Sequence, residues 1–311
     1  MIKKKKIFVN DHLFKKENFY KYDYYKKKYK IIFNKFNRSL TDIDLKKLFY
    51  KNKDIIGIIA GLENYNFQTT HYLNSLKAIS RVGVGLDSLD LDYFKKKSIK
   101  VFRLKNELTT SVAELYVSLI LTIIRKIINN LDNMRRGHWD PIIGNNLYEK
   151  KIGIIGYGKI GKKIHRLLKA FNCEFFIFEK RKIKIKNVKQ TSLSKVFAKC
   201  DIVCIAINFS RETDKIINSK ILNKANKNLV LINASRGGVI NESHLLKFLQ
   251  GNRTATAFLD CFTVEPYYGK LIKQPNIYSL PHIASYTVET RKKMELSASK
   301  SLVNYLDKIN K

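Results

Sequence analysis

The sequence predicts an α/β protein of about two domains, each built on a parallel β-sheet covered by helices. The chain has 311 residues, of which 45% are hydrophobic, so it can bury two sizeable cores. Short apolar segments alternate with helical ones both before and after a long apolar helix. Strands separated by helices indicate parallel sheets with helices on both faces, and a glycine-rich turn opens the second run of strands.

Within the first hundred residues we predict four strands and one helix start, which belong to the first of these domains. A capping box is expected where Thr41 is followed three residues later by Asp44. The glycine turn Gly83-Val84-Gly85 follows the third of the predicted strands. We predict these strands over 7–9, 54–60, 76–82 and 99–102.

A long apolar helix is predicted from Val112 to about Leu131, opened by a second capping box of Ser111 and Glu114. A polar loop that contains Trp139 follows it. The alternation then restarts with a strand at 152–155, a helix at 160–171 and a strand at 174–178. Further strands are predicted over 201–207, 229–234, 256–261 and 276–280.

The composition excludes several classes of protein. The net charge is +34, but the lysines are spread along the chain, so we interpret them as a solvated basic surface. Residues 20–36 interleave aromatics with lysines, a pattern that single-stranded nucleic acid can use, yet we do not expect a nucleic-acid partner. The apolar stretch 115–124 is far shorter than the roughly 20 residues of a membrane span. No secretory signal is apparent and the four cysteines form no CxxC pair, so we expect a cytoplasmic protein that contacts no membrane.

Residues 156–161 form a GxGxxG motif, read as Gly156-Tyr157-Gly158-Lys159-Ile160-Gly161. An apolar strand precedes it, an amphipathic helix follows it, and the next strand ends at Glu179, which is the context of a Rossmann dinucleotide site. The phosphates are expected at the helix N-terminus, where free N–H groups favour negative charge. Glu179 is expected to accept hydrogen bonds from the adenosine ribose and to repel the 2′-phosphate of NADP. We therefore predict NAD as the cofactor, although Lys180 and Arg181 next to it leave NADP open.

Three segments downstream each end a predicted strand with an ionisable residue, Arg236, Glu265 and His282. Ligands of doubly wound sheets bind beyond the carboxyl ends of the strands, so the three side chains can converge. A guanidinium matches a substrate carboxylate, the imidazole can donate a proton to a carbonyl oxygen, and the glutamate can orient the imidazole. Singly, each has a plain structural interpretation. Together, after a dinucleotide motif, they predict reduction of a keto acid.

At this point the chain resembles the D-isomer-specific 2-hydroxyacid dehydrogenases, the family that includes D-3-phosphoglycerate dehydrogenase. The resemblance runs over nearly the whole chain and rests on ISRVGVGLDSLD, SVAEL, GIIGYGKIGKKI, NASRGGVI, LDCFTVEP and PHIAS. It implies a Rossmann NAD domain of residues 105–286 inserted into a smaller flavodoxin-like substrate domain of 1–104, completed by 287–311. It also implies a homodimer formed through the cofactor domain, with the Trp139 loop as the swapped contact.

The resemblance further assigns roles to matching positions. Arg236 would hold the substrate carboxylate and keto oxygen, His282 would be the acid/base, and Glu265 its partner. The cofactor would be contacted by Ala234 and Asp260, the latter at its nicotinamide end. The substrate carboxylate would be bound by N–H groups of Val84 and Gly85, and Arg81 is a candidate to bind a substrate phosphate. The family often has a His and a Pro where this chain has Ala206 and Asn208, which puts one contact of the cofactor wall in doubt.

Two functions stay open on the sequence. The first is an NAD-dependent dehydrogenase that interconverts a 2-keto acid and a D-2-hydroxy acid by hydride transfer, with 3-phosphoglycerate, a small unphosphorylated acid or a sugar-derived acid as substrate. The second is an NAD(H)-sensing scaffold or corepressor-like protein without significant turnover. Because a scaffold has no physical need for Arg236, Glu265 and His282 together, we favour the enzyme.

Overall fold

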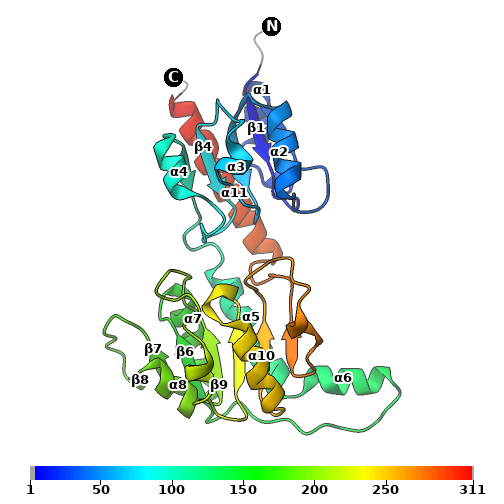
Figure 1. Ribbon diagram of the computed structural model, residues 1–311, viewed down its shortest axis with the longest axis vertical. Helices are drawn as coiled ribbons and strands as arrows, with labels where there is room; N and C mark the ends of the chain where they lie inside the picture. The colour runs from blue at the N-terminus through cyan, green and yellow to red at the C-terminus, as the bar shows by residue number, and fades with distance from the viewer. Residues whose placement is uncertain (1–3, 310–311) are drawn as a thin grey trace. The chain divides into compact units, whose positions relative to one another are not determined.

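The computed structural model describes residues 4–309 and divides the chain into two compact units (Figure 1). The terminal unit consists of Met1–Glu107 and Thr287–Lys311, and the central unit of Leu108–Tyr286. The chain therefore leaves the terminal unit, builds the central one and returns. The boundaries expected from the resemblance, 104/105 and 286/287, lie close to this division.

The terminal unit is built on a parallel sheet of five strands in the order β2-β1-β3-β4-β5. This order is that of flavodoxin-like doubly wound folds. Central strand β3 is fully buried and reads IIGIIA, as expected for a parallel strand covered on both faces. The strands are β1 (Lys6–Val9), β2 (Lys30–Phe33), β3 (Ile55–Ala60), β4 (Ala78–Arg81) and β5 (Lys100–Phe102).

Helices cover both faces of this sheet. The last helix, α11 (Val288–Ile309), lies against β4 (Figure 1). It packs its buried Leu302 and Leu306 against Gly57 of β3. A side chain at Gly57 would meet those leucines, so the glycine lets helix and sheet approach closely. The capping box of Thr41 and Asp44 is confirmed at the start of α2. The other helices of the unit are η1 (Lys16–Asn18), α1 (Tyr22–Lys28), α2 (Asp42–Lys51), α3 (Phe67–Thr70) and α4 (Leu91–Lys96).

The central unit is built on a parallel sheet of seven strands in the order β12-β11-β10-β9-β6-β7-β8. Counted from β6, this is the Rossmann order 3-2-1-4-5-6 with one further strand beside the sixth. The chain reverses direction across the sheet between β6 and β9, where such folds bind ligands. The strands are β6 (Lys151–Ile155), β7 (Glu174–Phe178), β8 (Val188–Gln190), β9 (Ile202–Ile205), β10 (Val230–Asn233), β11 (Thr256–Leu259) and β12 (Ile277–Ser279).

Alternate residues of β6 face two different cores of the central unit. Ile154 packs with α5 (Thr109–Ile124) and α7 (Lys159–Leu168), whereas Ile155 packs with α8 (Leu193–Lys199) and α10 (Glu242–Gly251). Helices therefore cover both faces of the sheet, and the predicted α/β fold class is confirmed. The remaining elements are α6 (Ile127–Arg135), η2 (Lys169–Phe171), α9 (Ser219–Leu222), η3 (Gly237–Val239) and η4 (Lys270–Lys273).

The helix predicted from Val112 to about Leu131 is in fact two helices. Lys126 adopts a left-handed conformation with φ 53°, which ends α5 at Ile124 and starts α6 at Ile127. The capping box of Ser111 and Glu114 is also wrong, because α5 begins before it at Thr109. The Ser111 hydroxyl instead donates to the carbonyl of Leu108.

Two strands escaped the sequence prediction, β2 (Lys30–Phe33) and β8 (Val188–Gln190). Each lies at the edge of its sheet and pairs on one side only. Both are short and partly exposed: β2 has only three apolar residues after Lys30, and β8 reads VKQ, so neither shows the longer buried run of a central strand. Across residues 4–309, no helix has the length and apolar character needed to cross a membrane.

Candidate active site

The turn between β6 and α7 has the shape of a phosphate-binding turn. Gly156 has φ +89°, and a Cβ there would lie 2.6 Å from the carbonyl oxygen of Ala206. A Cβ at Gly161 would lie 2.2 Å from the carbonyl oxygen of Gly156, so only glycine lets helix and turn pack. At Gly158, by contrast, a Cβ would meet nothing within 4 Å. The open space at the N-cap of α7 is where a pyrophosphate would approach the backbone, so the residues present fit a dinucleotide.

Glu179 follows β7 and is tied to this turn. Its Oε2 accepts the backbone N–H of Tyr157 at 2.9 Å, and its Oε1 accepts that of Arg181 at 3.3 Å. Burial alone would raise the pKa of Glu179, but these hydrogen bonds and the Arg181 guanidinium outweigh it and lower the pKa. The carboxylate is thus charged and fixed beside the glycine turn, where a ribose hydroxyl can donate to it.

The buried side chain of Tyr116 supports the opposite wall of this site, and sequence reasoning missed it. Tyr116 lies on α5, its hydroxyl donates to the carbonyl of Ile205, and it accepts the N–H of Ala234 at 2.9 Å. It therefore joins the carboxyl ends of β9 and β10. Its apolar surroundings on α5 made it indistinguishable from an ordinary core aromatic in the sequence.

The predicted acid/base pair is formed in the central unit. His282 Nδ1 donates to Glu265 Oε2 at 2.8 Å, while Glu265 Oε1 accepts the N–H of Phe262 at 2.9 Å. Burial would raise the pKa of Glu265, but the hydrogen bond and the charge of His282 lower it. The ionised glutamate fixes the ring so that Nε2 of His282 is the nitrogen left for proton transfer. Both side chains are partly exposed, as a group that meets a substrate must be.

Asp260 holds the histidine segment in place. Its two carboxylate oxygens accept the backbone N–H groups of Ile283 at 2.7 Å and Ala284 at 2.9 Å. His282 itself has φ +57°, a left-handed conformation that is unfavourable for histidine and is held by these bonds. The side chain of Asp260 is only 1% exposed, and burial raises its pKa. In this structure Asp260 therefore positions the histidine segment, while its predicted contact with the nicotinamide stays a prediction.

Arg236 follows β10 and completes the group. Its Nη1 donates to the carbonyl of Ser235 at 2.7 Å, and its own carbonyl accepts from the Asn233 side chain at 3.0 Å. The guanidinium charge acts on Glu265 and contributes to the lowered pKa of that carboxyl. A Cβ at the next residue, Gly237, would lie 1.9 Å from the backbone of Phe262, so the loops after β10 and β11 are in close contact. Arg236, Glu265 and His282 thus all follow strands at the carboxyl end of one sheet, with His282 bonded to Glu265 and the charge of Arg236 acting on it, and their catalytic roles stay a prediction.

The residues predicted to bind substrate from the terminal unit lie at the end of β4. Arg81 is 6% exposed, and its Nη1 donates to the carbonyls of Val82 at 3.0 Å and Ala60 at 3.4 Å. Its guanidinium carbon lies 3.2 Å from where a Cβ of Gly83 would be. The Arg81 guanidinium therefore packs against the glycine turn and supports its backbone. Val84 and Gly85 are half-buried in that turn.

Among residues 4–309, no group of three or more His, Cys, Asp or Glu side chains is placed to hold a metal ion. An imidazole paired with a carboxylate beside a guanidinium can protonate a carbonyl oxygen while the guanidinium holds a carboxylate.

Comparison with known proteins identifies the family. Residues 117–284 match the profile of the D-isomer specific 2-hydroxyacid dehydrogenase, NAD binding domain. This chain belongs to that family. It is thus an oxidoreductase that acts on CH–OH groups, a 2-keto acid reductase or 2-hydroxyacid dehydrogenase with NAD(P) as cofactor. The family assignment made from the six sequence motifs is confirmed.

Several characterised members of the family are similar to the chain over about three quarters of its length. A glyoxylate reductase of Thermofilum pendens is 35% identical over 245 residues, which cover 75% of this chain and 72% of the relative. The human glyoxylate reductase/hydroxypyruvate reductase is 33% identical over 74% of each chain. A D-3-phosphoglycerate dehydrogenase of Bacillus subtilis is 31% identical over 75% of this chain, which spans only 46% of that relative.

Solved structures share the fold of this chain. The TT0316 protein of Thermus thermophilus superposes with a TM-score of 0.86 over 97% of both chains at 23% identity. An NADPH-dependent glyoxylate/hydroxypyruvate reductase of Sinorhizobium meliloti gives 0.82 over 96% of this chain and 92% of its own, at 24% identity. At these identities the likeness establishes the two-domain fold, and the chemistry rests on the residues described above.

Proposed function

We propose that this family member is an NAD-dependent D-2-hydroxyacid dehydrogenase that reduces a small 2-keto acid. The observation that carries the proposal is the hydrogen bond of 2.8 Å between His282 Nδ1 and Glu265 Oε2 beside Arg236. It leaves Nε2 of the histidine to give a proton to a keto oxygen. A scaffold that only senses the cofactor would gain nothing from this arrangement.

Each side chain of the group has a distinct task in the proposed reaction. Arg236 binds the substrate carboxylate and polarises the neighbouring carbonyl. His282 protonates the carbonyl oxygen in reduction and removes that proton in oxidation, while Glu265 stabilises the charged ring. Bound NADH supplies the hydride to the carbonyl carbon. N–H groups of Val84 and Gly85 are the proposed second contact of the carboxylate.

The proposed preference for NAD rests on Glu179. Its carboxylate is ionised and fixed by the Tyr157 N–H, and a 2′-phosphate at the same place would meet its negative charge. One lysine that could have compensated, Lys180, is paired with Glu212. Some structural relatives are NADPH-dependent, so the preference is a property to be measured for this chain.

The proposed substrate class is a small, unphosphorylated 2-keto acid such as glyoxylate or hydroxypyruvate. Relatives at 33–35% identity carry these names. The side chain of Arg81, the candidate for a phosphate, is instead buried and donates to backbone carbonyls of Val82 and Ala60. A phosphorylated substrate such as phosphohydroxypyruvate thus has less support from this geometry.

The test is consumption of NADH and NADPH by the purified protein with glyoxylate, hydroxypyruvate, pyruvate, phosphohydroxypyruvate and branched keto acids. We expect the highest kcat/KM with NADH and one of the first two acids. His282→Ala should lose activity by about 100-fold or more, while still binding NADH. NADH binding without turnover of any acid would contradict the proposal and favour a cofactor-sensing scaffold.

We also propose that the enzyme is a homodimer formed through α6 and the segment 137–148. The backbone of this segment is fixed to α6, since Asn130 bonds to both backbone groups of Ile142 and Asn133 donates to the carbonyl of Asp140. Yet two of its apolar side chains point outward: Trp139 is 83% and Ile143 90% exposed, whereas Leu147 is buried. An ordered arm with exposed apolar side chains is typical of a surface that a partner covers.

A further inference from the structure

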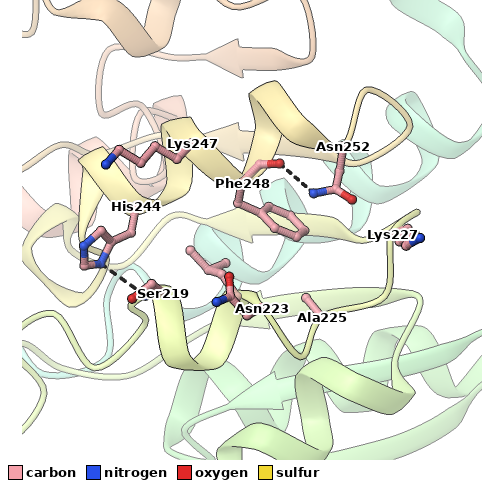
Figure 2. Close-up of a pocket in the computed structure, with 9 residues that line it drawn as sticks. Ser219, Asn223, Ala225, Lys227, His244, Lys247, Phe248 and Asn252 are labelled. Carbon is pink, nitrogen blue, oxygen red and sulfur yellow. Dashed lines mark hydrogen bonds between the residues drawn. The ribbon is translucent and has the colours of Figure 1, made fainter.

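A cavity of about 380 Å³ lies in the central unit between α9 and α10, and no predicted site residue lines it (Figure 2). A cavity of this volume is large enough to hold a small organic molecule. Figure 2 shows α10 along one side and α9 with the chain that follows it along the other. The cavity is therefore separate from the dinucleotide turn and from the catalytic group, and neither uses it.

The middle of the cavity is apolar. Leu222 is buried on α9, Ala225 lies on the turn after it, and the Phe248 ring projects from α10 into the space between the helices (Figure 2). A planar apolar group can stack on the phenylalanine ring and cover the two aliphatic side chains. This part of the lining favours a ligand with a flat apolar body.

The ends of the cavity carry positive charge and hydrogen-bond donors. His244 and Lys247 lie toward one end and Lys227 at the other, and no acidic residue contributes to the lining (Figure 2). The Nδ1 atom of His244 accepts the N–H of Ser219 at 3.1 Å, so its second ring nitrogen carries a proton and is a donor. Cations and donors around an apolar centre fit an anionic group attached to a flat body.

We propose that this cavity binds a small aromatic carboxylate. Its ring would lie against Phe248, and its carboxylate would be held by one of the lysines. A neutral aromatic of the same shape would lose the ionic contacts, and a simple inorganic anion would lose the stacking. The ligand is thus defined by both properties together.

The occupant would also affect the proposed keto-acid site, because both helices are joined to the segment after Arg236. Before α9, the N–H groups of Lys215 and Ile217 donate to the carbonyls of Gly238 and Val239. At the start of α10, Glu242 Oε1 accepts the N–H of Thr263 at 2.7 Å, in the loop that holds Glu265. A ligand that changes the spacing of α9 and α10 shifts these loops. This second step rests on the proposed function, whereas the binding itself does not.

The binding test uses benzoate as the probe and benzamide as its neutral counterpart, titrated calorimetrically into the full-length protein with saturating NADH. We expect benzoate to bind with one-to-one stoichiometry and benzamide to bind at least several-fold more weakly. Equal affinity for both compounds, or no binding of benzoate at millimolar concentration, would overturn the proposal.

Charge-reversed variants locate the benzoate. Lys227→Glu with Lys247→Glu reverses two exposed lysines of the lining and should weaken benzoate binding by about tenfold or more. The control is Lys220→Glu with Lys224→Glu, two exposed lysines on and beside α9 that do not line the cavity. The control should bind benzoate nearly as the wild type does. The same loss in both double variants would show a general charge effect and refute the site.

The coupling is measured separately from the binding. The substrate is the keto acid that gives the highest kcat/KM in the proposed panel. Benzoate should change the KM for this acid at least twofold in the wild type and in the control double variant, and should not change it in the cavity double variant. Benzoate binding without any change in KM would refute the coupling and leave the site intact. If the protein turns over no keto acid, the proposed function fails while calorimetry still decides whether the cavity binds benzoate.

Discussion

At the scale of single residues, the catalytic pair depends on which imidazole nitrogen is left for the substrate. The carboxylate of Glu265 can only accept, so the proton on Nδ1 of His282 is fixed by their hydrogen bond. The lowered pKa of Glu265 keeps that carboxylate charged at neutral pH. Nε2 is therefore the ring nitrogen that can exchange a proton with a keto acid in the proposed reaction.

Replacing Glu265 by glutamine tests this role. The amide can accept a hydrogen bond but can also turn its NH2 group toward the ring, so the proton on Nδ1 of His282 is no longer fixed. We expect kcat for keto-acid reduction to fall about tenfold or more. Stopped-flow measurement of NADH consumption gives this value. Glu242→Gln is the control, because Glu242 accepts a backbone N–H of the same loop without contacting His282.

Glu63 gives a second prediction at this scale, for stability. It lies after β3 and is 7% exposed. Its Oε1 accepts the N–H of Leu40 at 3.2 Å, and its Oε2 has no hydrogen-bond partner among residues 4–309. Burial, which outweighs its backbone hydrogen bonds, and to a smaller degree the charge of Asp11 raise its pKa to about 7, against a lesser opposing effect of Arg81. Between pH 4.5 and 7 the folded chain keeps a proton that the unfolded chain releases, so stability falls as pH rises through this window.

Glu63→Gln should therefore be more stable than the wild type above pH 7, by up to about 3 kcal/mol, and gain nothing below pH 4. The amide oxygen can still accept from Leu40, so the native contact is kept. Urea unfolding at several pH values measures the difference, and Glu17→Gln, an exposed glutamate of the same unit, is the control. A difference that does not vary with pH would contradict the assigned ionisation.

The proposed catalytic residues could be chosen from the sequence, because their residue types and their positions after strands both indicate acid/base chemistry, and their catalytic roles stay a prediction. The sequence could not predict the contacts that position these residues in the folded chain. Asp260 was expected at the nicotinamide, but its bonds to Ile283 and Ala284 depend on a left-handed backbone at His282 that no pattern signals. Arg81 was a candidate to bind a substrate phosphate, and in the structure its guanidinium packs against Gly83.

At the scale of secondary structure elements, α5 does more than cover the sheet. Its Tyr116 joins the ends of β9 and β10 through one buried hydroxyl, which donates to Ile205 and accepts from Ala234. Both strand ends border the proposed cofactor site. The helix thereby fixes the spacing of two loops to which it is not connected in sequence.

Tyr116→Phe removes that hydroxyl and keeps the ring. The buried N–H of Ala234 then loses its acceptor, and we expect the free energy of unfolding to fall by about 1–3 kcal/mol. NADH binding should also weaken, since Ala234 is a proposed cofactor contact. Chemical denaturation and a fluorescence titration measure the two effects. Tyr278→Phe, which loses a single half-buried bond to Asn129, should cost less and leave NADH binding unchanged.

Elements that bury much apolar surface were easier to predict from the sequence than elements that bury little. Central strands such as β3 and β7 stand where the sequence placed them, because an apolar run marks a strand covered on both faces. Edge strand β8 reads VKQ and has no such run, and the three apolar residues of edge strand β2, Ile31–Phe33, are only partly buried. The break at Lys126 was also hidden, because both α5 and α6 carry apolar residues and no glycine or proline separates them.

At the scale of the whole molecule, the two sheets have the strand orders of two known doubly wound folds, and both are parallel throughout. The alternation of strands and helices was enough to predict this fold class, since parallel strands need a crossover helix. Dimer formation, unlike the fold class, cannot be predicted from this alternation, because it depends on which apolar side chains are exposed on the folded surface. Trp139 was predicted as a contact by resemblance, whereas the exposure of Ile143 follows only from how the arm lies on α6.

The proposed dimer is tested by charging this arm. Trp139→Glu with Ile143→Glu places two carboxylates on side chains that are 83% and 90% exposed, so folding should be unaffected. Burying two charges in an interface is unfavourable, and we expect the mass measured by light scattering to fall from that of two chains to that of one. Tyr24→Glu, another exposed aromatic but in the terminal unit, should leave the mass unchanged. A wild type that is monomeric at micromolar concentration would refute the proposal, because no second copy would then cover the exposed apolar side chains of segment 137–148.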